Sequence, residues 1–242
     1  MSASGATATP PTRGDLIVYR LCRSIAVGAS RLYFPGTVKG RENLPVGGAY
    51  IVAPVHRSYV DWLIVARITR RQRLRYIVKE EVWKSKLIGR LLLACGAFPV
   101  NRSGADREAL QRCHAVLRGG EPLVMFPEGT RRSGPEVQVL KDGVAYLSLR
   151  ANVPVVPVGI GGAERAMPRG SSFPRPRRVN IVIGPPVPAT SPAPQHRSDK
   201  TEDPAASPRR ARIGREATTE QSLRVRAAIQ QAFDAAEASL RR

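Results

Sequence analysis

The sequence is short of cysteine, histidine, aromatic and acidic residues. Its 242 residues include 3 cysteines and 3 histidines, aromatic side chains make up 5%, and 19 Asp and Glu stand against 39 Lys and Arg. Cys22, Cys95 and Cys113 are an odd number without the paired spacing of a metal site, so we interpret them as reduced thiols in a cytosolic setting. His114 follows Cys113, but no second such pair exists, and we expect no metal site.

The sequence also lacks a long uninterrupted apolar run. Residues 1–15 are small and polar and include proline, which is not typical of a signal peptide. The most apolar stretch, residues 16–34, contains Arg20, Arg23 and Arg31, and each arginine near a bilayer centre costs about 2.5–3.5 kcal/mol on the insertion scale. This predicts no transmembrane span. An amphipathic helix at a membrane interface and an ordinary core helix both remain open.

The excess of basic residues gives a net charge of +20, which indicates an anionic partner. Nucleic acid, an acidic membrane surface and a phosphorylated substrate all fit that charge, and a generally solvated basic surface is the alternative without a partner. The basic residues concentrate in residues 67–90 and in a second region formed by Arg175, Arg177, Arg178 and residues 209–215. No recognised nucleic-acid-binding module or aromatic stacking pattern accompanies them, which argues against nucleic acid.

Apolar periodicity predicts alternating helices and strands. We expect helices at residues 15–34, 59–70, 82–95, 104–118, 140–150 and 217–241, and strands at residues 49–55, 74–79, 97–100, 122–127, 153–160 and 178–187. This alternation predicts an α/β fold in which helices flank a central mixed, mostly parallel sheet.

Composition divides the chain into four regions. We expect a disordered start and an amphipathic interfacial helix in residues 1–34, and the main α/β domain in residues 35–190. Residues 191–216 are rich in proline, serine and charge, which is typical of a flexible linker. Residues 217–242 are expected to form a C-terminal helix with one apolar face.

The stretch "VHRSYVDW", residues 55–62, suggests a catalytic pair. A neutral imidazole can take a proton from a hydroxyl group, and a carboxylate on its other ring nitrogen fixes the tautomer. Positions five apart in one helix point about 140° apart, so His56 and Asp61 can meet only if His56 precedes the helix. Ser58 as N-cap, with Asp61 at the third position after it, allows this. The alternative is that Asp61 merely caps a helix and His56 is a loop residue.

Three further stretches follow in order: "GAFPVNR" at 96–102, "FPEGTR" at 126–131 and "VPVVPVGI" at 153–160. The second follows a buried strand, where α/β proteins usually bind ligands. Gly129 lets the backbone approach a ligand, and Arg131 can hold a phosphate through two parallel hydrogen bonds. The alternative is a tight turn with a surface arginine.

The order and spacing of these four stretches resembles the glycerolipid acyltransferase family, most closely the bacterial 1-acylglycerol-3-phosphate acyltransferases, over about residues 35–190. The resemblance implies that an acyl chain moves from acyl-CoA or an acyl-carrier protein to the sn-2 hydroxyl of 1-acylglycerol 3-phosphate, giving phosphatidic acid. It implies that His56 is the general base, oriented by Asp61, and that the hydroxyl attacks directly without an acyl-enzyme. The chain contains no G-x-S-x-G nucleophile motif.

The resemblance also implies which residues bind the substrates. The residues carried over as contacts of the phosphorylated acceptor are Arg102, Glu128, Gly129, Thr130 and Arg131. Pro99 departs from the Ile or Val common in the family, so the backbone near Arg102 is expected to differ. Lys141 matches a family lysine without an assigned role. The "VPVVPVGI" run is expected to be a core strand and a wall of the acyl pocket.

The resemblance implies no cofactor beyond the acyl donor and no metal. The expected partners are a lysophospholipid, the acyl donor and an anionic membrane surface, with the enzyme peripheral on the cytoplasmic face of the membrane. Acylation of another lyso-lipid, such as a lyso-ornithine lipid, remains open, as does a basic nucleic-acid-binding protein. Binding to anionic liposomes compared with duplex DNA at physiological salt separates the last alternative from the others.

Overall fold

One seven-stranded sheet forms the centre of the molecule. The computed structural model describes residues 13–69, 72–79, 83, 89, 92–93, 96–100, 106–168, 170–190 and 213–241. Within them the strands are β1 (Val38–Lys39), β2 (Ile51–Pro54), β3 (Arg75–Lys79), β4 (Ala97–Val100), β5 (Leu123–Val124), β6 (Val155–Gly161) and β7 (Asn180–Ile183). Their order is β1-β7-β6-β2-β5-β3-β4, and every pair is parallel except β6 with β7. The predicted α/β fold with a mixed, mostly parallel sheet is confirmed.

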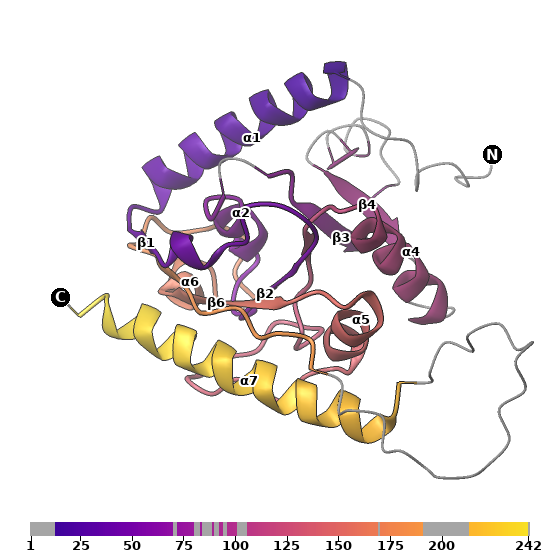
Figure 1. Cartoon of the computed structure of the whole chain (residues 1–242). Helices are drawn as coiled ribbons and strands as arrows, with labels where there is room; N and C mark the ends of the chain where they lie inside the picture. The colour runs from indigo at the N-terminus through magenta and orange to yellow at the C-terminus, as the bar shows by residue number, and fades with distance from the viewer. Residues whose placement is uncertain are drawn as a thin grey trace, which may run out of the picture.

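Helices lie on both sides of this sheet, with α1 along the top and α7 along the bottom of the view in Figure 1. The helices are α1 (Arg13–Tyr33), η1 (Arg41–Asn43), α2 (Asp61–Val65), α4 (Asp106–Arg118), α5 (Gly143–Ala151), α6 (Ala163–Ala166) and α7 (Arg215–Ala238). The helix predicted at 82–95 falls almost entirely outside the described residues. So do residues 1–12 of the predicted disordered start and residues 191–212 of the predicted linker.

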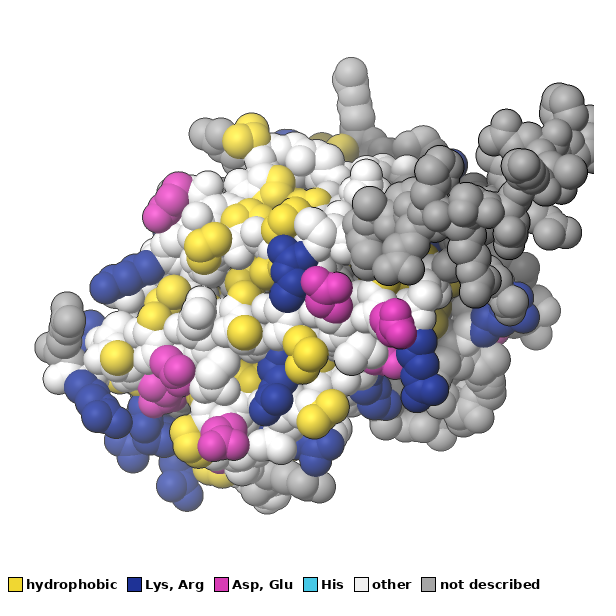
Figure 2. Space-filling view, turned by 60° about the horizontal axis from the view of Figure 1, so that its bottom comes forward, with side chains coloured by type: hydrophobic (Ala, Val, Ile, Leu, Met, Phe, Trp, Pro, Cys, Tyr) yellow, Lys and Arg dark blue, Asp and Glu magenta, His cyan; other side chains and the backbone are white. Residues whose placement is uncertain are grey.

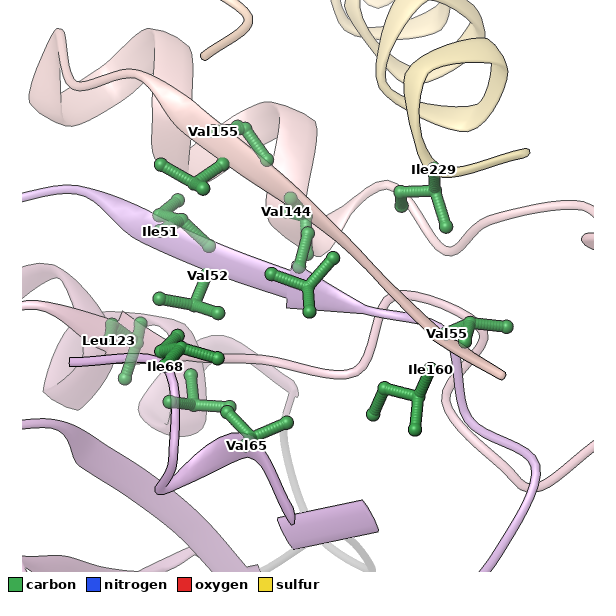
Figure 3. Close-up of a cluster of buried hydrophobic side chains, with 14 of the residues drawn as sticks. Ile51, Val52, Val55, Val65, Ile68, Leu123, Val144, Val155, Ile160 and Ile229 are labelled. Atoms are coloured by element: carbon green, nitrogen blue, oxygen red, sulfur yellow. The ribbon is translucent and has the colours of Figure 1, made fainter. Parts of the chain in front are cut away.

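The core consists of aliphatic side chains on β2 and β6, which are buried along their whole length. Figure 3 shows Ile51 and Val52 of β2 close to Val155 of β6, with Val144 of α5 and Ile229 of α7 completing the cluster. Strands that are covered by helices on both faces lack a polar side. This explains why these segments are nearly continuous runs of apolar residues instead of alternating ones.

The helix α2 is much shorter than the predicted 59–70. It ends at Val65, after which Arg67 and Ile68 make tighter i→i+3 bonds to Ile64 and Val65. Arginine side chains donate hydrogen bonds to the carbonyl groups that would accept backbone N–H groups in a longer helix. Arg23 donates to the carbonyl of Ala66, and Arg41 donates to those of Arg67 and Ile68. These donors come from distant parts of the chain, so local periodicity could not reveal them.

The C-terminal helix α7 packs directly onto β6 and is part of the core. A Cβ atom placed on Gly159 would lie 2.1 Å from the carbonyl oxygen of Ala232, and one on Gly161 would lie 2.6 Å from the backbone of Ala236. Glycine at both positions therefore lets the helix backbone touch the strand. Val225, Ile229 and Phe233 bury their side chains in this contact.

Candidate active site

His56 lies just beyond the carboxyl end of β2, in the turn that leads into α2. Its Nδ1 atom is 2.9 Å from Oδ2 of Asp61, whose side chain is fully buried, while 21% of the His56 side chain is exposed. The imidazole ring stacks on Phe126 with the ring centroids 4.1 Å apart. The sequence prediction that His56 precedes the helix and meets Asp61 agrees with this geometry.

The carboxylate of Asp61 organises the turn around His56. Its Oδ2 also accepts the backbone N–H groups of Arg57 at 2.7 Å and Ser58 at 2.8 Å. Burial raises the pKa of Asp61 above its ordinary value, and the hydrogen bond and charge of His56 oppose that rise. Asp61 thus bonds back to Ser58, as the carboxylate of a capping box does. Ser58 as the N-cap is wrong, because α2 starts at Asp61 and its N-cap residue is Val60.

Glu128 of the FPEGTR segment lies behind this turn. Its side chain is fully buried, and both carboxylate oxygens accept hydrogen bonds from Arg57 Nη1, at 2.8 and 2.9 Å. Oε2 also accepts the backbone N–H of His56 at 3.1 Å, and Oε1 accepts that of Gln138 at 3.1 Å. This differs from the expected contact of Glu128 with the substrate, because its oxygens already face internal donors.

Arg57 is a residue of the site that the sequence reading missed. Besides Glu128, its guanidinium group binds the carbonyls of Gly134 at 3.2 Å and Glu136 at 2.8 Å, and it lies 5.1 Å from the ring centroid of Phe233 on α7. Glu128 is 71 residues away in the chain, so neither spacing nor periodicity could pair the two. Arg57 joins the His56 turn, the FPEGTR loop and α7 in one buried network.

The rest of the FPEGTR segment surrounds the exposed side of the site. Gly129 has φ 70°, and a Cβ atom there would lie 2.6 Å from Cε of Lys141, so glycine leaves room for this lysine. Thr130 is exposed. The guanidinium carbon of Arg131 lies 3.1 Å from the ring centroid of Tyr59. Its Nη1 atom is buried and no described residue accepts a hydrogen bond from it.

Arg102, the remaining predicted contact, lies outside the described residues, as do the side chain of Pro99 and all of Cys95. The other predicted residues form two groups. His56, Asp61 and Glu128 share one hydrogen-bonded cluster. Gly129 and Arg131 instead lie with Lys141 and Tyr59, two residues to which the sequence reading gave no role in binding. Tyr59 lies between His56 and Asp61 in the sequence, but no local signal could have shown that its ring contacts Arg131.

An apolar cavity of 1030 Å³ adjoins the pair. Phe126, the ring that stacks on His56, lines it, and so do Tyr59, Gly129 and Lys141. The lining passes from exposed Trp62 and Val139 to buried groups including Cys113, Val124 and Val144, with α1, α2, β3, α4 and α5 all contributing. The expected wall from β6 is wrong, because none of its residues lines the cavity. That strand is core only.

The N-terminal helix has two contrasting faces. Tyr19 is buried, its hydroxyl accepts the backbone N–H of Leu74, and Arg23 lines the cavity. Large apolar side chains on another face are exposed to solvent: Ile17, Leu21, Ile25 and Leu32. Among the described helices, none has both the length and the apolar character needed to span a membrane. The predicted amphipathic helix is therefore present, and it contributes to the core as well.

Part of the basic region at 67–90 is internal. Arg67 is almost fully buried and donates to the carbonyls of Phe34 and Gly36. Arg73 and Arg75 are largely covered and lie 3.9 and 3.5 Å from the carboxylate of Glu121. These three charges are used inside the molecule, so they add little to its outer surface.

The chain is similar to a family of known proteins. A family model described as "Acyltransferase" matches residues 36–161. A 1-acyl-sn-glycerol-3-phosphate acyltransferase of Bacillus subtilis is 26% identical over 170 residues, which are 70% of this chain and 82% of that protein. One from Chlamydomonas reinhardtii is 31% identical, covering 65% of this chain and 48% of its own length. One from Streptococcus pneumoniae is 30% identical, covering 47% and 42%.

The alignments with the algal and streptococcal relatives thus span about half of those proteins or less. Among solved structures, the 1-acyl-sn-glycerophosphate (LPA) acyltransferase PlsC from Thermotoga maritima matches with a TM-score of 0.66 at 21% identity. The match covers 90% of this chain and 81% of that one. It shows that the two chains share a fold.

Proposed function

The chain belongs to the acyltransferase family, and on that premise we propose that it acylates the sn-2 hydroxyl of 1-acylglycerol 3-phosphate to give phosphatidic acid. The observation that carries the proposal is the His56–Asp61 pair, 2.9 Å apart, beside an apolar cavity of 1030 Å³. A base next to a hydroxyl-bearing phospholipid and a cavity lined by apolar groups suit the transfer of a fatty acyl chain. Acyl-CoA and acyl-carrier protein both fit as donors.

His56 acts as the general base in this reaction. Asp61 accepts a hydrogen bond from Nδ1–H, which leaves Nε2 with its lone pair for the acceptor hydroxyl. As Nε2 takes the hydroxyl proton, the oxygen attacks the thioester carbonyl and forms the new ester bond. The C–S bond then breaks, and the departing thiolate receives the proton from the imidazolium. The proton thus passes from the hydroxyl to the thiol, and the enzyme returns to its starting state.

Arg131 and Lys141 supply the positive charge for the acceptor's phosphate. Lys141 lines the cavity, Arg131 lies against Tyr59 of that lining, and Nη1 of Arg131 has no acceptor among the described residues. An unpaired buried donor is costly, and a bidentate phosphate oxygen pair satisfies it. Gly129 permits the approach of Lys141, and exposed Thr130 lies between Gly129 and Arg131 and can offer its hydroxyl.

Glu128 and Arg57 act as positioning residues. The carboxylate of Glu128 holds the backbone N–H of His56, and Arg57 neutralises that carboxylate inside the protein. Neither side chain exposes a polar group to the cavity. Their role is to fix the position of the imidazole relative to the FPEGTR loop, because a base must lie within hydrogen-bond reach of its proton.

The enzyme works at the membrane that holds its lipid substrate, attached as a peripheral protein on the cytoplasmic face. The exposed apolar side chains of α1 support this attachment, with Arg20 and Arg31 beside them to pair with lipid phosphates. Flotation with anionic vesicles tests it. The Leu21→Ser/Ile25→Ser protein should float less than the parent. The control Val46→Ser/Leu223→Ser protein, which loses two other exposed apolar side chains, should float like the parent. Equal flotation of all three would refute attachment through α1.

The test of the reaction is an acceptor panel. The purified protein receives labelled acyl-CoA or acyl-carrier protein together with 1-acylglycerol 3-phosphate, lysophosphatidylcholine, lysophosphatidylglycerol or a lyso-ornithine lipid. The products are identified by mass. The proposal predicts that phosphatidic acid forms at the highest kcat/KM. Faster acylation of another lyso-lipid would show that the acceptor is wrong, and no acylation of any lipid would reject the reaction.

A further inference from the structure

A loop between α6 and β7 presents an exposed aromatic side chain on a firmly held backbone. We call residues 170–178 the arginine loop. Phe173 is 81% exposed, whereas the backbone around it is bonded at several points. The Ser171 hydroxyl donates to the carbonyl of Phe173, and the N–H of Arg175 donates to that of Ala166 at 2.7 Å. The ring of Phe173 is therefore held outward on an ordered loop.

The arginines of this loop border a hollow of 780 Å³ in which positive charge is unmatched. Arg175, Arg177 and Arg178 are exposed there, and Arg165 and Arg241 complete the basic lining. Figure 2 shows Lys and Arg side chains gathered at the left of the molecule, the side on which α7 ends in Figure 1.

The single acidic residue of the hollow does not balance these charges. Glu237 already accepts the N–H of Gly162 at 2.7 Å with one oxygen and Arg165 at 3.1 Å with the other. Within the part of the chain that the structure describes, no carboxylate forms an ion pair with Arg175, Arg177 or Arg178. Three neighbouring guanidinium groups without a counter-charge form a surface suited to anions.

The arginine loop is also joined to the active-site turn and to the end of α1. It follows α6 at the carboxyl end of β6, a strand parallel to β2, so it lies at the same edge of the sheet as His56. Directly before it, the carbonyl of Met167 accepts the hydroxyl of Ser58 at 2.9 Å. On the other side, the Tyr33 hydroxyl donates to the carbonyl of Pro174 at 2.9 Å.

We propose that the arginine loop binds anionic phospholipid headgroups and is a second membrane contact beside α1. Guanidinium groups pair with phosphodiesters in two-point hydrogen bonds, and an aromatic ring fits the boundary between headgroups and acyl chains. The hydrogen bond between Tyr33 and Pro174 joins α1 to the loop. Phe173 is next to Pro174 in the sequence, and Leu32, which is 88% exposed, is next to Tyr33. A lipid surface presents phosphates and hydrocarbon at neighbouring depths, whereas a soluble acidic protein does not.

The consequence is a fixed orientation on the membrane. A helix alone leaves the protein free to rotate about the helix axis, whereas a second contact at the edge that carries His56 turns that edge toward the lipid. The inference rests on the proposed membrane attachment of the enzyme, but binding to vesicles does not require turnover. A failure of the acceptor assignment is therefore distinguishable from a failure of this surface.

The test is flotation with vesicles of phosphatidylcholine alone and with about 30% phosphatidylglycerol added. Basic residues near an anionic surface each contribute to binding, so Arg175→Gln/Arg177→Gln/Arg178→Gln should weaken partitioning onto anionic vesicles at least about tenfold at low salt. The matched control, Arg107→Gln/Arg118→Gln/Arg150→Gln, removes three exposed charges from α4 and α5 and should bind within about twofold of the parent. Thermal midpoints near that of the parent establish folding.

Phe173→Ser tests the apolar half of the contact and should weaken partitioning about fivefold at any salt, whereas Val46→Ser, also at an exposed apolar site, should not. Parent-like flotation of the loop triple variant, or an equal loss in its control, overturns the proposal. A third arm measures pull-down of an acidic acyl-carrier protein. If the loop variant loses that binding and floats normally, the partner is the protein and the lipid surface is wrong.

Discussion

At the scale of single residues, the buried carboxylate of Asp61 orients His56 for activity but costs folding free energy. It fixes the imidazole and two backbone N–H groups with one oxygen, while its other oxygen is buried without a partner among the described residues. Removing a carboxylate from water is costly even when it is bonded. A residue that only capped a helix would have no need of such a buried position.

Asp61→Asn should therefore stabilise the fold at neutral pH while it removes activity. Because burial raises the pKa of Asp61 above 3.8, the folded state binds its proton more tightly than the unfolded chain does. The stability that this proton contributes is fully present below the pKa of the unfolded chain. It is lost as the pH rises through the pKa of Asp61 in the folded protein. Relative to the parent, the unfolding free energy of Asp61→Asn should rise as the pH increases above about 4, as urea denaturation measures.

Acyl transfer by the same variant should fall by at least about 10²-fold, because an amide no longer fixes the tautomer of His56. A stability difference that stays constant with pH, or that falls as the pH rises, would contradict the raised pKa. Activity near that of the parent would contradict the orienting role.

Arg131→Lys separates the two substrates. Lysine keeps the charge but loses the planar group that stacks on Tyr59 and the two-point grip on phosphate. We expect the KM for 1-acylglycerol 3-phosphate to rise about tenfold while the KM for acyl-CoA stays within about twofold. Initial-rate kinetics with each substrate varied in turn measure both constants. The reverse pattern would place Arg131 on the acyl donor.

Glu128→Gln tests whether this residue positions His56 or contacts the substrate. Breaking a buried ion pair leaves Arg57 uncompensated and should cost about 3–5 kcal/mol of unfolding free energy. The kcat should fall while the KM for either substrate changes little. Glu108→Gln, which breaks an exposed pair with Arg112, is the control and should cost about 0.5 kcal/mol or less. A raised acceptor KM with parent-like kcat and stability would favour direct contact.

At the scale of elements, α7 supports the active site from outside the resemblance seen in the sequence. Gln230 of α7 accepts the N–H of Val137 at 2.7 Å and donates to the carbonyl of Pro135, while Arg226 donates to the carbonyl of Val137. The next residue, Gln138, donates its N–H to Glu128. The helix α7 thus holds residues 135–138 in place, and this segment in turn bonds Glu128 of the FPEGTR loop.

Gly159→Ala should loosen this helix. The added methyl group would fall 2.1 Å from the carbonyl oxygen of Ala232, a backbone atom that cannot move without shifting α7. We expect a loss of about 3 kcal/mol or more in unfolding free energy, measured by urea denaturation. Gly47→Ala is the control, since nothing lies within 4 Å of its Cβ position. A change within about 1 kcal/mol for both variants would contradict the close packing.

The sequence predicted elements well where the information is local. Buried runs gave β2 and β6, and apolar periodicity gave α1, α4, α5 and α7 to within a few residues. It predicted too long a helix at α2, because the carbonyls after Val65 are bonded by Arg23 and Arg41 from elsewhere. Gly159 and Gly161 inside a strand were an unused signal, since such glycines indicate close approach of another backbone.

In the candidate site, too, local contacts could be predicted from the sequence and long-range contacts could not. The pairing of His56 with Asp61 could be predicted because they are only five residues apart, and helix periodicity lets them meet only if His56 precedes the helix. The partners of Glu128 could not, since Arg57 is 71 residues away and only the parallel alignment of β2 and β5 brings the two loops together. The environment of the Glu128 side chain depends on its burial, and burial is a property of the whole fold.

At the scale of the whole molecule, the net charge of +20 divides into internal and external parts. Arg57 and Arg67 are buried and bonded inside, whereas the arginine loop lies at the edge of the sheet near His56 and, on α1, Arg20 and Arg31 are exposed beside its apolar face. An anionic, membrane-bound substrate fits this distribution better than a long nucleic acid, because the outward charges lie beside apolar side chains.

The rate of phosphatidic acid formation by His56→Ala tests the role of His56 as general base most directly. Its control is His114→Ala on α4, a residue that does not line the cavity. We expect a fall of at least about 10²-fold in kcat for His56→Ala, with a parent-like thermal midpoint, and near-parent activity for the control. Activity above about a tenth of the parent in the folded His56→Ala protein would contradict the assignment of His56 as the general base.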